Sequence, residues 1–185
     1  MGVNLSTVNL VAGSKLDVDI NLESLIELDF ESFEYDPETF PGASVKVDTT
    51  LPNILIFSSG KFMIQGAKNE NEIKEVIQEF KKRLNESGII SQRRDEVEFD
   101  IVNRVFKLEL DESLNLDRIA NEGLKGEIEY VPEQSPYIVY RPSKYEAVLT
   151  ISSSGNCVLN GTKDTKTAEK VADHLVTHLT KKNFI

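Results

Sequence analysis

The chain has 185 residues, of which 39% are hydrophobic and 28% charged, as in ordinary globular proteins of one generous domain or two small ones. Its N-terminus lacks the basic-then-apolar pattern of a signal peptide, and no apolar run approaches the roughly 20 residues of a membrane span, so we expect an intracellular protein. The formal net charge of −10 argues on average against a nucleic-acid partner, although a local basic face can coexist with acidic surface elsewhere.

Chemistry-bearing residues are sparse. Cys157 is the single cysteine, and His174 and His178 are the only histidines, so the chain lacks a ligand set for structural zinc. The two histidines lie four residues apart, which is a metal-ligand spacing on a helix, but an exposed helix face is the favoured interpretation. No phosphate-binding loop or nucleophile with a partnered base is present. We therefore expect no enzyme activity, no metal and no cofactor.

The predicted elements follow the same order twice. A strand, VNLVAGSKL, precedes a helix that begins after Asn21, with Leu22, Leu25, Ile26 and Phe30 at helical spacing. The strands SVKVD, NILIFSS and KFMIQ follow, and a long helix capped by Asn69 closes the first half. The second half has IVNRVFKLEL, a helix after Asn115, the strands IVYR, EAVLTISS and NCVLN, and a long helix capped by Asp164.

Sequence identities support an internal duplication. YDPETFPG at 35–42 matches YVPEQSPY at 130–137, an offset of 95 residues, and SSG at 58–60 matches SSG at 153–155 at the same offset. One insertion shifts the start, where Asn9 pairs with Asn103 at an offset of 94. Matches in the same order along both halves indicate repeats, which we place at residues 1–92 and 93–185.

Hairpin-connected strands predict a mostly antiparallel sheet with helices on one face. Alternation along NILIFSS and KFMIQ turns Ile54 and Ile56 toward the helices and leaves Leu55, Phe57 and Met63 on the open face. An exposed apolar sheet face of this kind usually marks a binding site.

The motifs VNLV, YDPETFPG, LIFSSGK and QGAK, echoed by IVNRV, YVPEQSP, TISSSGN and NGTK, resemble the TATA-box-binding protein family in its archaeal form. The resemblance covers nearly the whole chain. It implies an α+β fold, in which two pseudo-symmetric repeats form a saddle: a curved ten-stranded antiparallel sheet with four helices on the convex face. It also implies binding of A·T-rich promoter DNA in the minor groove, the mechanism by which this family itself is known.

The resemblance assigns wedging phenylalanines that insert between base steps. The first repeat keeps them as Phe40 and Phe57, whereas Ser135 and Ser152 occupy the second-repeat positions. Serine cannot wedge, so we expect a one-sided kink and weaker binding, unless Phe106, Tyr137 or Tyr145 replaces the lost rings.

The resemblance also places further DNA contacts in both repeats. Asparagine amides suit the acceptors of A·T pairs, small or aliphatic residues meet the groove floor, and basic residues meet phosphates. The matching positions are Asn9, Asn103, Val11, Val105, Met63, Val158, Gln65, Asn160, Lys46, Lys61 and Arg141. Asn156 stands where a second-repeat lysine is expected.

A protein partner is implied by the second-repeat loop. In the family this loop docks a transcription factor B homologue, and Glu133 and Gln134 match that surface, although Val131 replaces a usual acid. The resemblance further implies the RNA polymerase machinery as a partner, a possible homodimer of the free protein, and a nucleoid-associated location if the chain is archaeal or a nuclear one if it is eukaryotic.

Two functions stay open at this point. The leading hypothesis is a general or specialised initiation factor with asymmetric intercalation from the first repeat. The competing hypothesis is a protein-interaction module or decoy on the same fold that binds DNA weakly or not at all. Plainer roles compete for each residue as well: core packing for the phenylalanines, turn positions for the asparagines and solvated charge for the basic residues.

Overall fold

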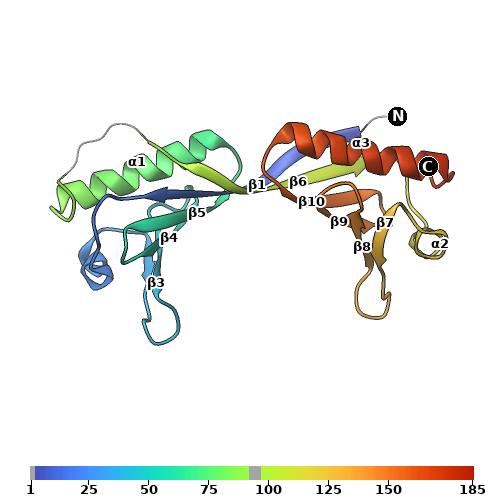
Figure 1. Ribbon diagram of the computed structural model, residues 1–185. Helices are drawn as coiled ribbons and strands as arrows, with labels where there is room; N and C mark the ends of the chain where they lie inside the picture. The colour runs from blue at the N-terminus through green and yellow to red at the C-terminus, as the bar shows by residue number, and fades with distance from the viewer. Residues whose placement is uncertain (1–2, 92–96) are drawn as a thin grey trace. The chain divides into compact units, whose positions relative to one another are not determined.

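The computed structural model describes residues 3–91 and 97–185, which form two compact units (Figure 1). The first-repeat unit is Asn9–Val102, and the second-repeat unit combines Met1–Val8 with Asn103–Ile185. Residues 3–8 thus belong to the unit that carries the second repeat. The predicted boundary between residues 92 and 93 lies outside the described residues.

Ten strands are hydrogen-bonded in the order β2-β3-β4-β5-β1-β6-β10-β9-β8-β7, and the pairings within each unit are antiparallel. The α+β class is as the resemblance implied, and the described residues contain the expected ten strands and four helices. The residue patterns had missed two short edge strands, β2 and β7. The strands are β1 (Val3–Lys15), β2 (Ser32–Glu34), β3 (Gly42–Lys46), β4 (Asn53–Phe57), β5 (Lys61–Ala67), β6 (Asp100–Leu110), β7 (Gly126–Glu129), β8 (Tyr137–Pro142), β9 (Val148–Ser152) and β10 (Asn156–Thr162).

In the first-repeat unit, helix α1 (Glu70–Glu86) covers one face of the sheet (Figure 1). Asn69 caps it, because its side chain accepts a hydrogen bond from the Glu72 amide at 3.0 Å. The predicted stripe on this helix is fully buried, as are the inward residues of the strands beneath it, so both predictions are confirmed. The buried residues are Ile54, Ile56, Phe62, Ile64, Ile73, Val76, Ile77 and Phe80.

The first predicted helix is instead a short 3-10 helix, η1 (Leu22–Glu27). Asn21 caps it as expected, and Leu22 and Leu25 are buried, but Ile26, which falls at α-helical spacing with them, is 69% exposed. Three residues per turn align positions i and i+3 on one side. The tighter winding therefore rotates Ile26 away from the core that an α-helix would have let it reach.

In the second-repeat unit, α2 (Leu116–Glu122) and α3 (Thr165–Lys181) occupy the corresponding places. Asn115 and Asp164 cap them by accepting hydrogen bonds from the backbone amides of Arg118 and Thr167, the third residue of each helix. The predicted stripe of α3 is buried: Ala168, Val171, Ala172, Leu175 and Leu179. Within the described residues, no helix is long and apolar enough to cross a membrane.

Candidate nucleic-acid interface

The open face of the first-repeat sheet carries an aromatic pair. Phe57 ends β4, and Phe40 lies in the loop that leads into β3, with the two ring centroids 5.9 Å apart and the planes tilted by 58°. Phe40 is 46% exposed and Phe57 is half-buried. Neither ring belongs to the core, so the pair is available to a partner.

Hydrogen bonds to Asp36 hold the loop before β3, residues 35–41, in place. The Asp36 side chain accepts hydrogen bonds from the Glu38 amide at 3.0 Å and from the Thr39 hydroxyl, and its carbonyl accepts one from the Phe40 amide at 2.9 Å. The hydrogen bond from Thr39 is the main cause that lowers the pKa of Asp36. The turn that presents Phe40 is therefore organised by local contacts before any ligand binds.

Gly42 makes the aromatic pair possible. Gly42 lies directly across from Phe57 in the β3–β4 ladder. A Cβ at this position would lie 2.8 Å from Cε1 of Phe40 and 3.0 Å from Cε1 of Phe57, well inside the ordinary separation of about 3.5–4.0 Å between carbon atoms. The two rings can therefore adopt this arrangement only when residue 42 has no side chain.

Basic residues lie at the end of the same sheet face. Lys15 and Lys61 are cross-strand partners in the β1–β5 ladder, both exposed, and within the described parts of the chain neither forms an ion pair. Like charges directly opposite one another destabilise a sheet, so an anion between them would stabilise it. With Phe57 and Ser59 they border an open hollow of about 1400 Å³.

Lys15 is not among the DNA contacts predicted from the sequence. The repeat offset of 94 aligns it with Glu109, and this reversal of charge between the repeats is a signal that could have identified it. Lys46, which was predicted, is less available, because its ammonium group donates a hydrogen bond to the Leu51 carbonyl. Arg141 is likewise engaged, by Glu129 at 3.1 Å. Of the three predicted basic positions, Lys61 is the one whose charge is exposed and uncommitted among the described residues.

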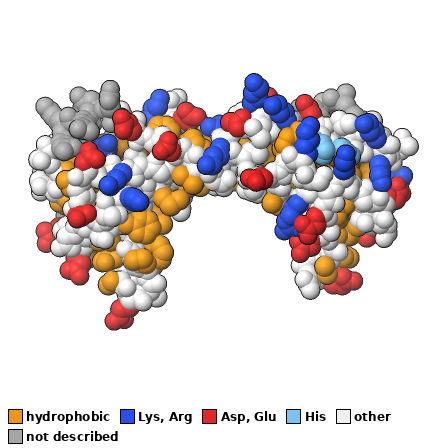
Figure 2. Space-filling view, viewed as in Figure 1, with side chains coloured by type: hydrophobic (Ala, Val, Ile, Leu, Met, Phe, Trp, Pro, Cys, Tyr) orange, Lys and Arg blue, Asp and Glu red, His pale blue; other side chains and the backbone are white. Residues whose placement is uncertain are grey.

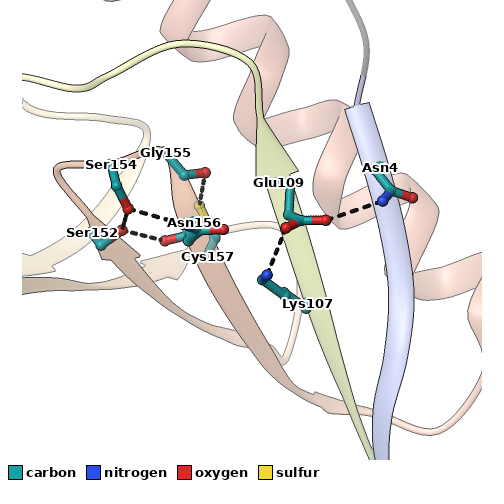
Figure 3. Close-up of polar contacts among 8 residues, drawn as sticks. All are labelled: Asn4, Lys107, Glu109, Ser152, Ser154, Gly155, Asn156 and Cys157. Atoms are coloured by element: carbon teal, nitrogen blue, oxygen red, sulfur yellow. Dashed lines mark hydrogen bonds and ion pairs between the residues drawn. The ribbon is translucent and has the colours of Figure 1, made fainter.

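The second-repeat face differs at the same positions. The Ser152 hydroxyl lies 2.8 Å from the Ser154 hydroxyl and donates to the Asn156 carbonyl at 2.9 Å, and the Asn156 amide donates to Ser154 (Figure 3). These contacts tie the end of β9 to the turn before β10. A small, satisfied polar cluster thus stands where the first-repeat unit has Phe57 and Lys61.

An acidic residue also lies on this face. Glu109 is the cross-strand partner of Asn156; it accepts hydrogen bonds from Lys107 at 2.6 Å and from the Asn4 amide at 3.1 Å (Figure 3). The bond from Lys107 is the main cause that lowers the pKa of Glu109, so the residue is anionic at neutral pH. The position that is a lysine in the first repeat is a carboxylate in the second.

The surface view agrees with this contrast (Figure 2). Hydrophobic side chains gather over the β3–β4 part of the first-repeat unit, whereas acidic and basic side chains lie side by side near β8 and β9 of the second-repeat unit. An apolar surface suits base edges and sugars, while a charge-paired surface presents little net attraction to phosphate.

The remaining predicted residues lie on β1 and β5 in the first-repeat unit and on β6 and β10 in the second-repeat unit. In the first-repeat unit, Val11 is the cross-strand partner of Gln65, and Leu55 that of Met63; Oδ1 of Asn9 is buried without a hydrogen-bond partner among the described residues. In the second-repeat unit the corresponding positions are Asn103, Val105, Val158 and Asn160, none of which is fully buried.

The loop predicted to hold a protein partner has the backbone turn of its first-repeat counterpart. The amides of Gln134 and Ser135 both donate to the Val131 carbonyl at 2.9 Å, as Thr39 and Phe40 do to Asp36. Glu133 and Gln134 are exposed, and Val131 is 42% exposed. The loop thus presents an acid and an amide beside an apolar side chain.

Two of the three proposed replacements for the lost rings are ruled out. Phe106 is 1% exposed in the core, so that alternative was wrong. Tyr145 packs against the second-repeat core on the helix side, its ring 5.5 Å from that of His174. Tyr137 is 45% exposed and stays available.

Comparisons with known proteins decide the family. The model for "Transcription factor TFIID (or TATA-binding protein, TBP)" matches residues 4–87 and 98–182. The chain belongs to the TATA-binding protein family. It is 36% identical to the TATA-box-binding protein of Thermococcus kodakarensis, over 99% of this chain and 94% of that one, and 37% identical to TATA-box-binding protein 1 of Methanosarcina acetivorans, over 88% and 87%.

A solved structure, the Methanococcus jannaschii TBP, superposes with a TM-score of 0.86 at 32% identity, covering 96% of this chain and 99% of that one. The TATA-binding protein fold predicted from the motifs is therefore confirmed, as is the archaeal character of the resemblance. Members of the family are non-enzymatic transcription factors, and no cluster of metal-binding side chains occurs in residues 3–91 and 97–185. The pair of histidines on α3 is better explained by packing, since the His178 ring nitrogen contacts the His174 carbonyl at 2.7 Å.

Proposed function

We propose that this TATA-binding protein family member binds A·T-rich promoter DNA in the minor groove and grips it unevenly, with the first-repeat unit supplying the main wedge. Family membership supports the coarser part, a DNA-binding transcription initiation factor. The observation that carries the finer part is the exposed Phe40–Phe57 pair, against Ser135 and Ser152 at the second-repeat positions.

Wedging requires an apolar side chain that enters a base step and stays rigid while doing so. Unstacking a step costs on the order of a few kcal/mol, which added contact with the bent duplex offsets. A ring that is held by a second ring enters with less loss of side-chain freedom than a lone one. The Phe40–Phe57 pair meets this requirement.

The charge pattern supports the same asymmetry. Lys15 and Lys61 offer two exposed ammonium groups at the end of the first-repeat face, while Glu109 and Asn156 occupy the aligned positions of the second-repeat face. Phosphate affinity comes from cations that release condensed counterions. The first-repeat end should therefore hold the backbone more strongly.

Groove reading is assigned to the residues between these ends. Asn9 and Asn103 have amide donors for the N3 and O2 acceptors of A·T pairs, and Val11, Val105, Met63 and Val158 give apolar contact with the floor. Gln65 and Asn160 lie two residues along the strand from Met63 and Val158, on the same face of the sheet, and add polar contacts.

The second-repeat loop is proposed to bind a transcription factor B homologue. Glu133 and Gln134 are exposed on a turn held by backbone hydrogen bonds, so a basic partner surface would meet a preformed loop. The RNA polymerase machinery would follow this factor to the promoter. We further propose that the protein works at the nucleoid, as its archaeal relatives suggest, and that the apolar open face permits a homodimer when DNA is absent.

A mobility-shift titration of an A·T-rich duplex, across salt concentrations and with and without the partner factor, tests the proposal. Saturable binding that weakens with salt and strengthens with the partner is expected. Absence of saturable binding at low salt with the partner present would reject it.

One observation favours a second candidate, a protein-interaction module that no longer binds DNA productively. The second-repeat face carries the Ser152 cluster and the anionic Glu109 where DNA contact is proposed. In that case the partner factor would bind the protein with unchanged affinity whether or not DNA is present.

A further inference from the structure

We propose that Tyr137 supplies the aromatic DNA contact of the second-repeat unit, from the neighbouring strand rather than from the positions of the lost phenylalanines. This inference rests on the proposed minor-groove binding. It assigns a residue that occupies the place of Gly42, where the first repeat has no side chain at all.

The strand registers show the exchange. In the first-repeat unit Gly42 on β3 pairs with Phe57 on β4; in the second-repeat unit Tyr137 on β8 pairs with Ser152 on β9. The same cross-strand pair is therefore a glycine opposite a phenylalanine in the first repeat and a tyrosine opposite a serine in the second repeat. The ring has moved across the ladder by about 5 Å, the spacing of neighbouring strands.

Tyr137 lies on the open face. Burial alternates along β8, with Ile138 and Tyr140 fully buried and Tyr137 45% exposed. Successive side chains of a strand point to opposite sides, so Tyr137 points away from the helices, on the same side as Ser152 across the ladder. It is among the exposed large apolar side chains of this unit.

Steric complementarity explains why the exchange involves three positions together. In the first-repeat unit a Cβ at residue 42 would collide with both Phe40 and Phe57. In the second-repeat unit both aligned residues are serines, whose short side chains leave that space to Tyr137. Losing two rings and gaining one at the glycine position is therefore a single coupled change in packing.

A DNA contact by Tyr137 should be weaker than one by the Phe40–Phe57 pair, so the first-repeat unit still contributes more to binding. Tyr137 has no second ring across the ladder to hold it, because Ser152 is bonded to Ser154 and Asn156. Its phenol ring can still stack on a base. We expect a stacking contact at the second end of the site and a full wedge at the first.

The chain contains no tryptophan, so single-tryptophan variants report on each position separately. Tyr137→Trp and Phe57→Trp should both lose fluorescence when an A·T-rich duplex is added, because an indole that stacks on bases is quenched. Tyr145→Trp, in the same unit but on the helix side, is the matched control and should change little. Quenching of Phe57→Trp with no change in Tyr137→Trp would overturn this inference while leaving the proposed function intact.

Affinity measurements with the smaller variants give a second readout. Tyr137→Ala should raise the dissociation constant by about tenfold, within the range for loss of one aromatic–base stack, and Tyr137→Phe should stay within about twofold of the unaltered protein. If Tyr137→Ala lowered the melting temperature but left DNA affinity unchanged, Tyr137 would be a packing residue and the inference would fail. No saturable DNA binding by the unaltered protein would instead reject the proposed function.

Discussion

The sharpest test of unequal DNA binding by the two repeats compares Phe57→Ala with Ser152→Ala, because the two residues occupy the same position in their repeats. Phe57 is half-buried, with its ring 5.9 Å from that of Phe40. Removing it deletes a base contact of about 1–3 kcal/mol. It also leaves Phe40 without an aromatic partner, which lowers the folding stability, and not the DNA affinity, by about 0.5–1.5 kcal/mol. Binding should weaken by about 5- to 150-fold, since each 1.4 kcal/mol is about tenfold.

Ser152→Ala removes a hydroxyl whose contacts lie at 2.8 Å and 2.9 Å to other groups of the same turn. Its loss should cost about 1 kcal/mol of folding stability and change DNA affinity by less than about twofold. Fluorescence anisotropy with a labelled A·T-rich duplex at fixed salt measures affinity, and energy transfer between the duplex ends measures bending. Thermal denaturation checks that both variants are folded. Equal losses of affinity and bending in the two variants would refute the asymmetry.

Further expectations concern the glycine, the two lysines and a histidine. Gly42→Ala should displace the aromatic pair, because its Cβ would lie 2.8 Å from Phe40; DNA bending should fall while the melting temperature stays within a few degrees, and unchanged bending would contradict the packing described. Lys15→Ala and Lys61→Ala should each lower the slope of log affinity against log salt by about 1, as measured by titrations at several salt concentrations; an unchanged slope would mean that the residue meets no phosphate. Desolvation by burial is the main cause that lowers the pKa of His174 from 6.5, so the unfolded chain takes up a proton at higher pH than the folded one. The contribution of His174 to the free energy of unfolding is complete above about pH 6.5 and is lost as the pH falls through the lowered pKa of the folded protein. Urea denaturation at several pH values should show this loss of stability, and the loss should be smaller in His174→Gln.

Local patterns in the sequence were sufficient for much of the fold. Side-chain alternation placed Ile54 and Ile56 under the helices and Phe57 on the open face, because the two-residue period of a strand leaves no other choice once one side is apolar. The caps Asn69 and Asp164 were predictable for a similar reason: a short polar side chain that satisfies a free helical amide acts within three residues of chain. The repeat and its motifs then identified the family.

Contacts between distant residues were beyond such patterns. Ile26 follows helical spacing, yet the 3-10 winding exposes it, because winding is set by how the segment packs and not by spacing alone. Lys46 and Arg141 look like free cations in the sequence, but folding brings the Leu51 carbonyl and Glu129 to them. The short edge strands β2 and β7 had no periodic signal of their own and form by pairing with β3 and β8.

The second-repeat loop and the strands beside it show most clearly what the sequence determines and what only the tertiary structure decides. The sequence alone determined that two phenylalanines are absent, since Ser135 and Ser152 can be read directly against Phe40 and Phe57. Only the tertiary structure brought Tyr137 opposite Ser152 and Gly42 opposite Phe57. The physical reason is that strand register joins residues 15 positions apart, and the volume that one side chain leaves empty becomes available to its cross-strand neighbour.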